Sequence, residues 1–221
     1  VTKRLTLKQL RIQLADVDKL EPSRRVDLAR EQLRLCIVKW GSTRLETMAC
    51  RIDLGEAQLA EMFFADSELT LRAAVVALEP VTATSESRYT LARGQSLLGA
   101  VLVEQSKYDE ARTLLEKALL LQPAASVERF HAQARLAALF AKMLLKDELA
   151  NMAALTRTTA AQMPKMTVTD KALLAATDAR LVCVTQRGTA CVSQWEKVLA
   201  LMETTYAKTD SRLTLALEPL V

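Results

Sequence analysis

Prolines divide this chain at nearly equal intervals, and their spacing constrains the fold more than any other feature of the sequence. Pro80, Pro123 and Pro164 are 43 and 41 residues apart. Between successive prolines, apolar residues recur at helical spacing in two stretches that a short turn separates. Because proline cannot continue the interior of a helix, each of these three is expected to close a pair of helices. Self-similarity at such a period indicates an array of helical repeats.

The composition favours helices over strands. The 221 residues include only five glycines and five prolines, the residues on which turns depend. Hydrophobic residues make up 50% of the chain and charged residues 25%, so it has enough apolar material for a core and too much for disorder. No apolar run reaches the roughly 18 residues that would span a bilayer, and no signal peptide is visible. We therefore predict an all-α protein without a transmembrane segment.

The hydrophobic pattern predicts long helices joined into antiparallel hairpins. We divide the chain into N-terminal capping helices at residues 1–42, helical repeats at residues 43–206 and a C-terminal capping segment at residues 207–221. The expected helices, in chain order, span residues 5–19, 23–40, 43–63, 66–79, 85–105, 108–121, 126–145, 147–162, 167–185, 191–206 and 210–217.

One predicted hairpin, Ala92 to Pro123, contains a Leu98-Gly99 pair followed by Tyr108 and Ala111. With this pattern it resembles a tetratricopeptide repeat (TPR), a helix-turn-helix of roughly 34 residues. This family has small residues where its two helices cross, and a larger side chain there would push the backbones apart. Gly99, Ala111 and Ala118 stand at those positions. The match is carried by Leu98, Gly99, Tyr108, Ala111, Leu115, Ala118 and Pro123.

Weaker copies of the same pattern flank this hairpin. The resemblance implies an α-solenoid of antiparallel helical hairpins, wound into a TPR-like right-handed superhelix. The alternative is a non-repeating helical bundle with one chance match. The copies are Leu54-Gly55, 44 residues before Leu98-Gly99; Ala138 and Ala150, 39 residues after Gly99 and Ala111; and Ala179, Cys191 and Trp195 in the last hairpin.

The resemblance also implies a binding surface. In this family the first helices of the hairpins line a concave groove that binds an extended peptide or a helix. Some members grip a C-terminal carboxylate with a Lys/Asn set, which Ser96 and Ala100 replace here. The implied groove mixes apolar and basic residues, which suits an amphipathic segment of a partner. Its residues, carried over by repeat position, are Arg93, Ser96, Ala100, Val103, Glu104, Arg135, Leu139, Lys142 and Met143.

The sequence carries no motif for catalysis or for a cofactor. His131 is the single histidine, and no Gly-x-Ser-x-Gly motif accompanies it. Neither a phosphate-binding loop nor a dinucleotide-binding glycine pattern is present, and the cysteine spacing matches no zinc site. We expect no catalytic residue, no metal and no cofactor, and we take His131 as an ordinary residue of a helix surface or groove.

The four cysteines form two pairs around predicted turns. Cys183 and Cys191 straddle the turn at residues 186–188, where antiparallel helices would bring their Cα atoms within the roughly 5.5 Å that a disulfide requires. Cys36 and Cys50 straddle an earlier turn less symmetrically. Two disulfides would indicate an oxidising compartment such as a bacterial periplasm. Four buried thiols acting as small apolar residues are the alternative, so the cytoplasm stays open.

These observations favour a module that binds another protein or peptide, as part of a bacterial signalling or assembly protein. The alternative is a sensory or regulatory ligand-binding domain of a transcriptional regulator or kinase. Residues 1–51 carry 12 Lys/Arg against 6 Asp/Glu, but the interleaved acids do not suit a phosphate-binding stripe, so we expect no nucleic acid. Leu213, Leu217 and Leu220 are spaced to share one helical face, which could either cover one end of the stack or form a homodimer through terminal helices.

Overall fold

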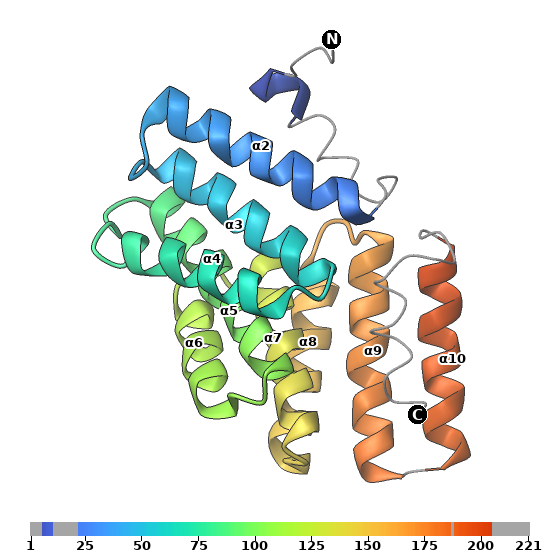
Figure 1. The fold of residues 1–221 in the computed structure, drawn as a ribbon. Helices are drawn as coiled ribbons and strands as arrows, with labels where there is room; N and C mark the ends of the chain where they lie inside the picture. Colours follow the sequence, from blue (N-terminus) through green and yellow to red (C-terminus); the bar gives the residue numbers. More distant parts are fainter. Residues whose placement is uncertain (1–5, 11–21, 187, 205–221) are drawn as a thin grey trace.

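The computed structural model describes residues 6–10, 22–186 and 188–204, and within these ranges it contains helices and no strands (Figure 1). A single helical turn at residues 7–10 precedes the long helices. The all-α prediction is therefore confirmed for the described residues. The long helices are α2 (Pro22–Trp40), α3 (Leu45–Ala60), α4 (Phe64–Leu78), α5 (Ser85–Glu104), α6 (Tyr108–Leu120), α7 (Val127–Lys142), α8 (Lys146–Gln162), α9 (Val168–Thr185) and α10 (Thr189–Glu203).

The helix at 210–217, with its proposed dimer contact, and the capping segment at 207–221 lie outside the described residues. Most of the helix at 5–19 does so as well. Elsewhere the helix ends differ locally: α4 starts at Phe64 rather than at 66, and no side chain caps it. The Ser67 hydroxyl, in the first turn of α4, donates to the Gly55 carbonyl of α3 at 2.7 Å.

The helices pack as antiparallel neighbours in two rows. Each helix from α2 onward contacts the next one in the chain, and α3, α5, α7 and α9 also contact one another in succession. Each of α4, α6 and α8 packs against the two odd-numbered helices that flank it in sequence. The largest buried cluster extends through α3 to α8, and a smaller one around Trp195 joins α9 to α10.

The closest approach of two helices recurs in successive hairpins. A Cβ atom on Gly99 would lie 2.6 Å from Leu115 Cγ, and one on Gly55 would lie 2.5 Å from Leu71 Cγ. Both pairs are separated by 16 residues, and Leu71 and Leu115 are fully buried. Any side chain at either glycine would force the facing leucine to move, so these two hairpins share one packing arrangement.

In the third hairpin, α7 with α8, the positions predicted to correspond to Gly99 and Ala111 of the hairpin before it are wrong by one residue. Ala150, expected at a buried site, is exposed, and Ala138 is half-buried. Their neighbours Ala137 and Leu149 are fully buried instead. The corresponding positions of the two hairpins are thus 38 residues apart rather than 39, as are Ser106 and Leu144, the left-handed residues of their turns.

That turn is the same in three hairpins. Met62, Ser106 and Leu144 adopt positive φ angles of 60°, 60° and 57° at the end of α3, α5 and α7. In each case the next backbone N–H donates to a carbonyl five residues earlier, as in Lys107 to Leu102 at 2.9 Å. Such a left-handed residue ends a helix and reverses the chain tightly.

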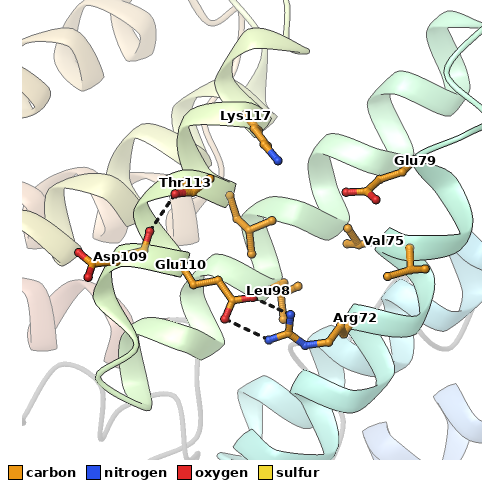
Figure 2. A pocket seen from close by; sticks show the side chains of 10 residues that line it. Arg72, Val75, Glu79, Leu98, Asp109, Glu110, Thr113 and Lys117 are labelled. Atoms are coloured by element: carbon orange, nitrogen blue, oxygen red, sulfur yellow. Dashed lines mark hydrogen bonds and ion pairs between the residues drawn. The ribbon is translucent and has the colours of Figure 1, made fainter.

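Ion pairs connect one hairpin to the next on the side of the even-numbered helices. The Arg72 guanidinium on α4 contacts Glu110 on α6 at 2.6 Å (Figure 2) and Glu68, one turn away on α4, at 2.7 Å. Lys107, just before α6, contacts Glu68 at 2.9 Å. Arg72 and Lys107 therefore share the Glu68 carboxylate, and the hydrogen bonds from these two cations lower its pKa to about 2.

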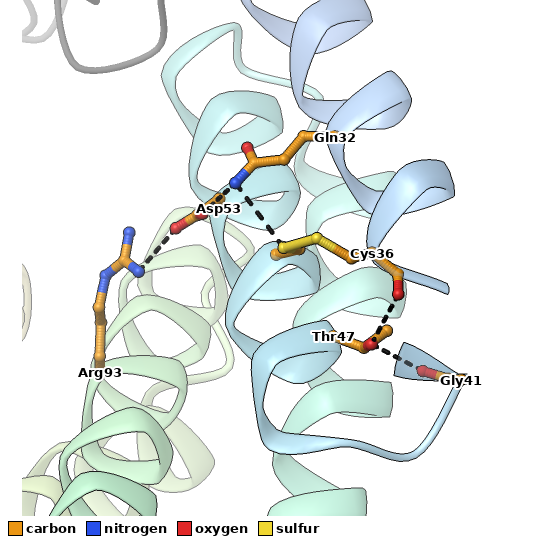
Figure 3. The surroundings of a disulfide bond; sticks show 7 residues. Gln32, Cys36, Gly41, Thr47, Asp53 and Arg93 are labelled. Atoms are coloured by element: carbon orange, nitrogen blue, oxygen red, sulfur yellow. Dashed lines mark hydrogen bonds and ion pairs between the residues drawn. A yellow bond between two sulfur atoms is a disulfide. The ribbon is translucent and has the colours of Figure 1, made fainter. Parts of the chain in front are cut away.

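Disulfide bonds join two helix pairs. Cys36 on α2 is bonded to Cys50 on α3, with Cα atoms 6.7 Å apart (Figure 3). Cys183 on α9 is bonded to Cys191 on α10, with Cα atoms 4.6 Å apart. The first disulfide is fully buried, whereas the second is partly exposed. Near the first, the Thr47 hydroxyl donates to the Gly41 carbonyl at 2.7 Å and closes the turn between α2 and α3.

Candidate functional site

Polar side chains connect the successive odd-numbered helices α3, α5, α7 and α9, and we call the surface that they form the odd-helix face. Arg93 on α5 contacts Asp53 on α3 at 2.7 Å and also Glu56 of the same helix. Each contact spans one hairpin, so the partners lie 37 to 40 residues apart in the sequence. The other contacts of this kind are Tyr89 to Glu128, Arg135 to Ser96, Lys142 to Glu104 and His131 to Asp170.

A small cavity lies on the odd-helix face. Its volume is about 130 Å³, room for a few water molecules at roughly 30 Å³ each. We call it the odd-helix cavity. Three helices line it: Glu56 from α3; Tyr89, Arg93, Ser96 and Leu97 from α5; and Glu128, His131 and Arg135 from α7.

The acidic and phenolic groups of the cavity have well-defined partners. Burial acts to raise the pKa of Glu56, but Arg93 and Arg135 outweigh it and hold this pKa below its usual value. Glu56 is therefore a carboxylate at neutral pH. Burial, together with the hydrogen bond to Glu128, raises the pKa of Tyr89 to about 12. The phenol stays protonated and donates to Glu128 Oε1 at 2.6 Å.

Arg135 is a charged residue of the cavity whose side-chain hydrogen bond goes to a neutral group. Its Nη1 donates to the neutral hydroxyl of Ser96 at 2.8 Å, and within the described part of the chain no carboxylate lies at ion-pair distance from it. Burial lowers the pKa of Arg135; the nearby Arg93 lowers it further, and only Glu56 acts in the other direction. A guanidinium has five N–H donors, so this one retains hydrogen-bonding capacity toward the cavity.

His131, also on α7, ties the cavity to α9. Its Nε2 lies 2.7 Å from Asp170 Oδ1, and Asp170 also accepts from the Thr167 backbone N–H at 2.9 Å and hydroxyl at 2.8 Å. Burial acts to raise the pKa of Asp170, but the hydrogen bonds from His131 and Thr167 outweigh it and lower the pKa to about 2. The carboxylate is therefore ionised at neutral pH, and the imidazole Nε2 donates the proton of this contact.

Asp170 is expected to make the fold sensitive to acid. Because its pKa is lowered from 3.8 to about 2, the ionised group contributes about 2 kcal/mol of stability above pH 4, which is lost as the pH falls from about 4 to about 2. Asp170→Asn should therefore lower the free energy of unfolding at neutral pH by about 2 kcal/mol and flatten its dependence on pH in that window. Urea unfolding between pH 2 and pH 7 measures both effects. Asp178→Asn, which removes an exposed ion pair with Arg157, is the control, and an acid dependence unchanged by Asp170→Asn would contradict the assignment.

The structure corrects part of the predicted groove. Ser96, Val103 and Leu139 were expected to be exposed, but their exposed fractions are 3%, 3% and 0%. The expectation is wrong for these three because α5 and α7 are each packed between neighbours of both rows. Val103 and Leu139 belong to the main core, and the Ser96 hydroxyl accepts from Arg135.

The remaining predicted residues lie on or beside the odd-helix face. Arg93, Glu104, Arg135 and Lys142 are brought there by α5 and α7 and have intramolecular partners. Ala100 is half-buried, and the half-buried Met143 packs against the core. Whether these residues bind a partner stays a prediction.

Four residues of the cavity were not predicted from the sequence. Glu56, Tyr89, Leu97 and Glu128 belong to no recognisable motif. One signal was present: Tyr89 and Glu128, like His131 and Asp170, are separated by 39 residues, close to one repeat. Complementary side chains at the repeat distance can meet when hairpins stack, but many unrelated pairs share that spacing.

Comparisons with known proteins assign no family to this chain: no family model matches it, and no curated protein matches it. Among the described helices, none combines the length and the apolar character that crossing a membrane would require. The packing and the polar contacts of the odd-helix face are therefore the basis for the functional inference.

Proposed function

We propose that this chain is a protein-interaction module, a TPR-like α-solenoid whose odd-helix face binds an extended or helical segment of a partner protein. The recurring glycine–leucine contacts, the repeated left-handed turns and the row of odd-numbered helices support this proposal. In a solenoid of this kind the odd-helix face is the concave surface. The proposed module acts by binding its partner and not by catalysing a reaction.

Arg135 is the observation that carries the proposal. Its guanidinium lines a cavity and is hydrogen-bonded to a neutral hydroxyl, so its free donors suit a carboxylate, which arginine binds in a planar, bidentate manner. The cavity is too small for more than one such group. Glu56 and Glu128 line it as well and would repel a dianion. The partner segment is therefore expected to present one acidic side chain, flanked by residues that rest on the odd-helix face.

A second candidate function uses the same cavity. In a sensory or regulatory domain of a transcriptional regulator or kinase, Arg135 would bind a free monocarboxylic acid rather than a peptide. The odd-helix cavity is small and polar, which favours this second function, because a molecule of few atoms fills it. The two disulfides support an oxidising compartment for either function.

A comparison of Arg135→Gln with wild type tests the proposal. A display library of 12-residue peptides is selected on wild-type protein, and the enriched peptides are measured by isothermal titration calorimetry. We expect enrichment of peptides with one acidic residue and at least tenfold weaker binding to Arg135→Gln. Arg112→Gln on α6, which removes a partly exposed arginine that is ion-paired with Glu116, is the matched control and should bind like wild type.

Acetate and propionate serve as competitors in the same titrations. If either raises the melting temperature of wild type, but not of Arg135→Gln, while no peptide is enriched, the sensory function is supported instead. Enriched peptides without acidic residues, or equal binding by Arg135→Gln, would contradict the role of Arg135. Circular dichroism confirms that both variants are folded.

A further inference from the structure

A second concave surface lies on the opposite row of helices, between α4 and α6 (Figure 2). It has a volume of about 410 Å³, within the range of roughly 300–1,000 Å³ typical of binding pockets. Its apolar part is formed by Val75, Val76, Leu98 and Leu114. We call it the even-helix groove. The ion pair between Arg72 and Glu110 closes one end, and Glu79 and Lys117 stand at the other.

One wall of this groove belongs to a helix with two apolar faces. The first apolar face of α4 is buried in the core and consists of Leu71, Ala74, Val75 and Leu78. A second set at helical spacing, Leu69, Ala73 and Val76, faces solvent, with Leu69 73% and Val76 63% exposed. A helix at the surface of a folded domain normally carries polar residues on its outer face. Within the described ranges of the chain, nothing covers this second apolar face.

The charges around the groove are unequal. Three carboxylates, of Glu79, Asp109 and Glu110, line it together with two cations, Arg72 and Lys117. Arg72 is already paired with Glu110 and Glu68. Within the described part of the chain, Glu79 and Asp109 have no ion-pair partner. Of the two cations that line the groove, Lys117 also lacks an ion-pair partner there. Two carboxylates and one ammonium group are thus left without ion-pair partners, so the net unpaired charge beside the apolar floor of the groove is negative.

We propose that the even-helix groove is an interaction surface for an amphipathic helix of another protein. This helix inserts a leucine-sized side chain between Val76 and Leu114 and places a lysine or arginine beside Glu79 or Asp109. A buried apolar anchor surrounded by a charged rim is the usual anatomy of a protein interface. The rim charge selects a basic partner segment and disfavours an acidic one. This surface uses no residue of the odd-helix cavity, so its occupation does not depend on the proposed function.

Two synthetic helical peptides test this surface. Both carry the same leucines at i, i+4 and i+7, flanked by lysines in one peptide and by glutamates in the other. Binding is followed by fluorescence anisotropy of the labelled peptide. We expect the lysine peptide to bind wild type at least tenfold more tightly than the glutamate peptide. Val76→Ser should weaken that binding at least tenfold, whereas Leu155→Ser, at a 51% exposed position on α8, should leave it unchanged.

Charge variants separate the rim from the floor. Glu79→Gln with Asp109→Asn should reduce the preference for the lysine peptide to less than threefold, and Arg135→Gln should leave it unchanged, since it alters the other face. The proposal is overturned if neither peptide binds at millimolar concentration, if Val76→Ser binds like wild type, or if the peptides bind equally well. Concentration-dependent dimerisation of wild type that Val76→Ser abolishes would identify a second copy as the occupant and would also overturn it.

Discussion

Glu61→Gln is expected to lower the free energy of unfolding by about 3–5 kcal/mol, because it removes a buried carboxylate that is ion-paired with a buried arginine. Glu61, at the end of α3, lies 2.9 Å from the Arg25 guanidinium on α2, and the two side chains are 8% and 1% exposed. A charge at such a depth is stable only with a partner nearby. Urea denaturation of the two proteins at neutral pH measures the difference.

Two further variants show that charge, and not shape, causes this loss. Replacing both partners, Arg25→Met with Glu61→Met, removes both buried charges and should leave stability close to that of wild type. Asp178→Asn, which removes a half-exposed ion pair between α8 and α9, should cost a small fraction of the Glu61→Gln effect. A Glu61→Gln protein as stable as wild type would show that the Arg25 charge is compensated by other groups.

Removal of the buried disulfide is the second large effect. We expect the double variant Cys36→Ala with Cys50→Ala to lose about 3 kcal/mol of unfolding free energy, the typical value for a closed loop of this length. The two cysteines are 14 residues apart in sequence and join α2 to α3. The cross-link restricts the unfolded chain, so its removal favours unfolding. Urea unfolding, with wild type treated with dithiothreitol as a second sample, measures the loss.

The second disulfide is the matched control. Cys183 and Cys191 are separated by 8 residues, so their removal releases a shorter loop and should cost less. The first disulfide also lies beside the odd-helix face: Gln32 lies 3.7 Å from Cys50 Sγ and donates to Asp53 at 3.2 Å, and Asp53 accepts from Arg93 (Figure 3). Unfolding curves that coincide for wild type and the Cys36/Cys50 variant would contradict the expected contribution.

Local sequence determined the helical character of this chain and most of its helix pairs. Periodic apolar residues, few glycines and the three spaced prolines act within one or two turns of backbone, so they can be read without knowing the fold. Gly99 was also interpreted correctly as a close-packing site, since a Cβ there would collide with Leu115. The small-residue requirement leaves a trace in the sequence because few residues satisfy it.

The sequence misplaced features that depend on where a turn begins. Leu144 and Leu145 continue an apolar pattern, so the helix was expected to reach residue 145, yet α7 ends at Lys142. Leu144 adopts a left-handed conformation, which a leucine in the sequence does not predict. This explains the one-residue error that assigned Ala138 and Ala150 to sites occupied by Ala137 and Leu149.

Tertiary packing alone decided which side chains are exposed and which charges meet. Periodicity gave α5 one buried face, but α3, α4, α6 and α7 all pack against it, so Ser96 and Val103 are buried. The contacts of Arg93, His131 and Lys142 join residues 37 to 40 positions apart, and only the stacking of hairpins brings those positions together. The sequence by itself thus determined the elements and their pairing, because these follow from local periodicity. Three features depend instead on how neighbouring hairpins are placed in three dimensions: the odd-helix cavity, the even-helix groove and the position of Arg135 beside a neutral hydroxyl.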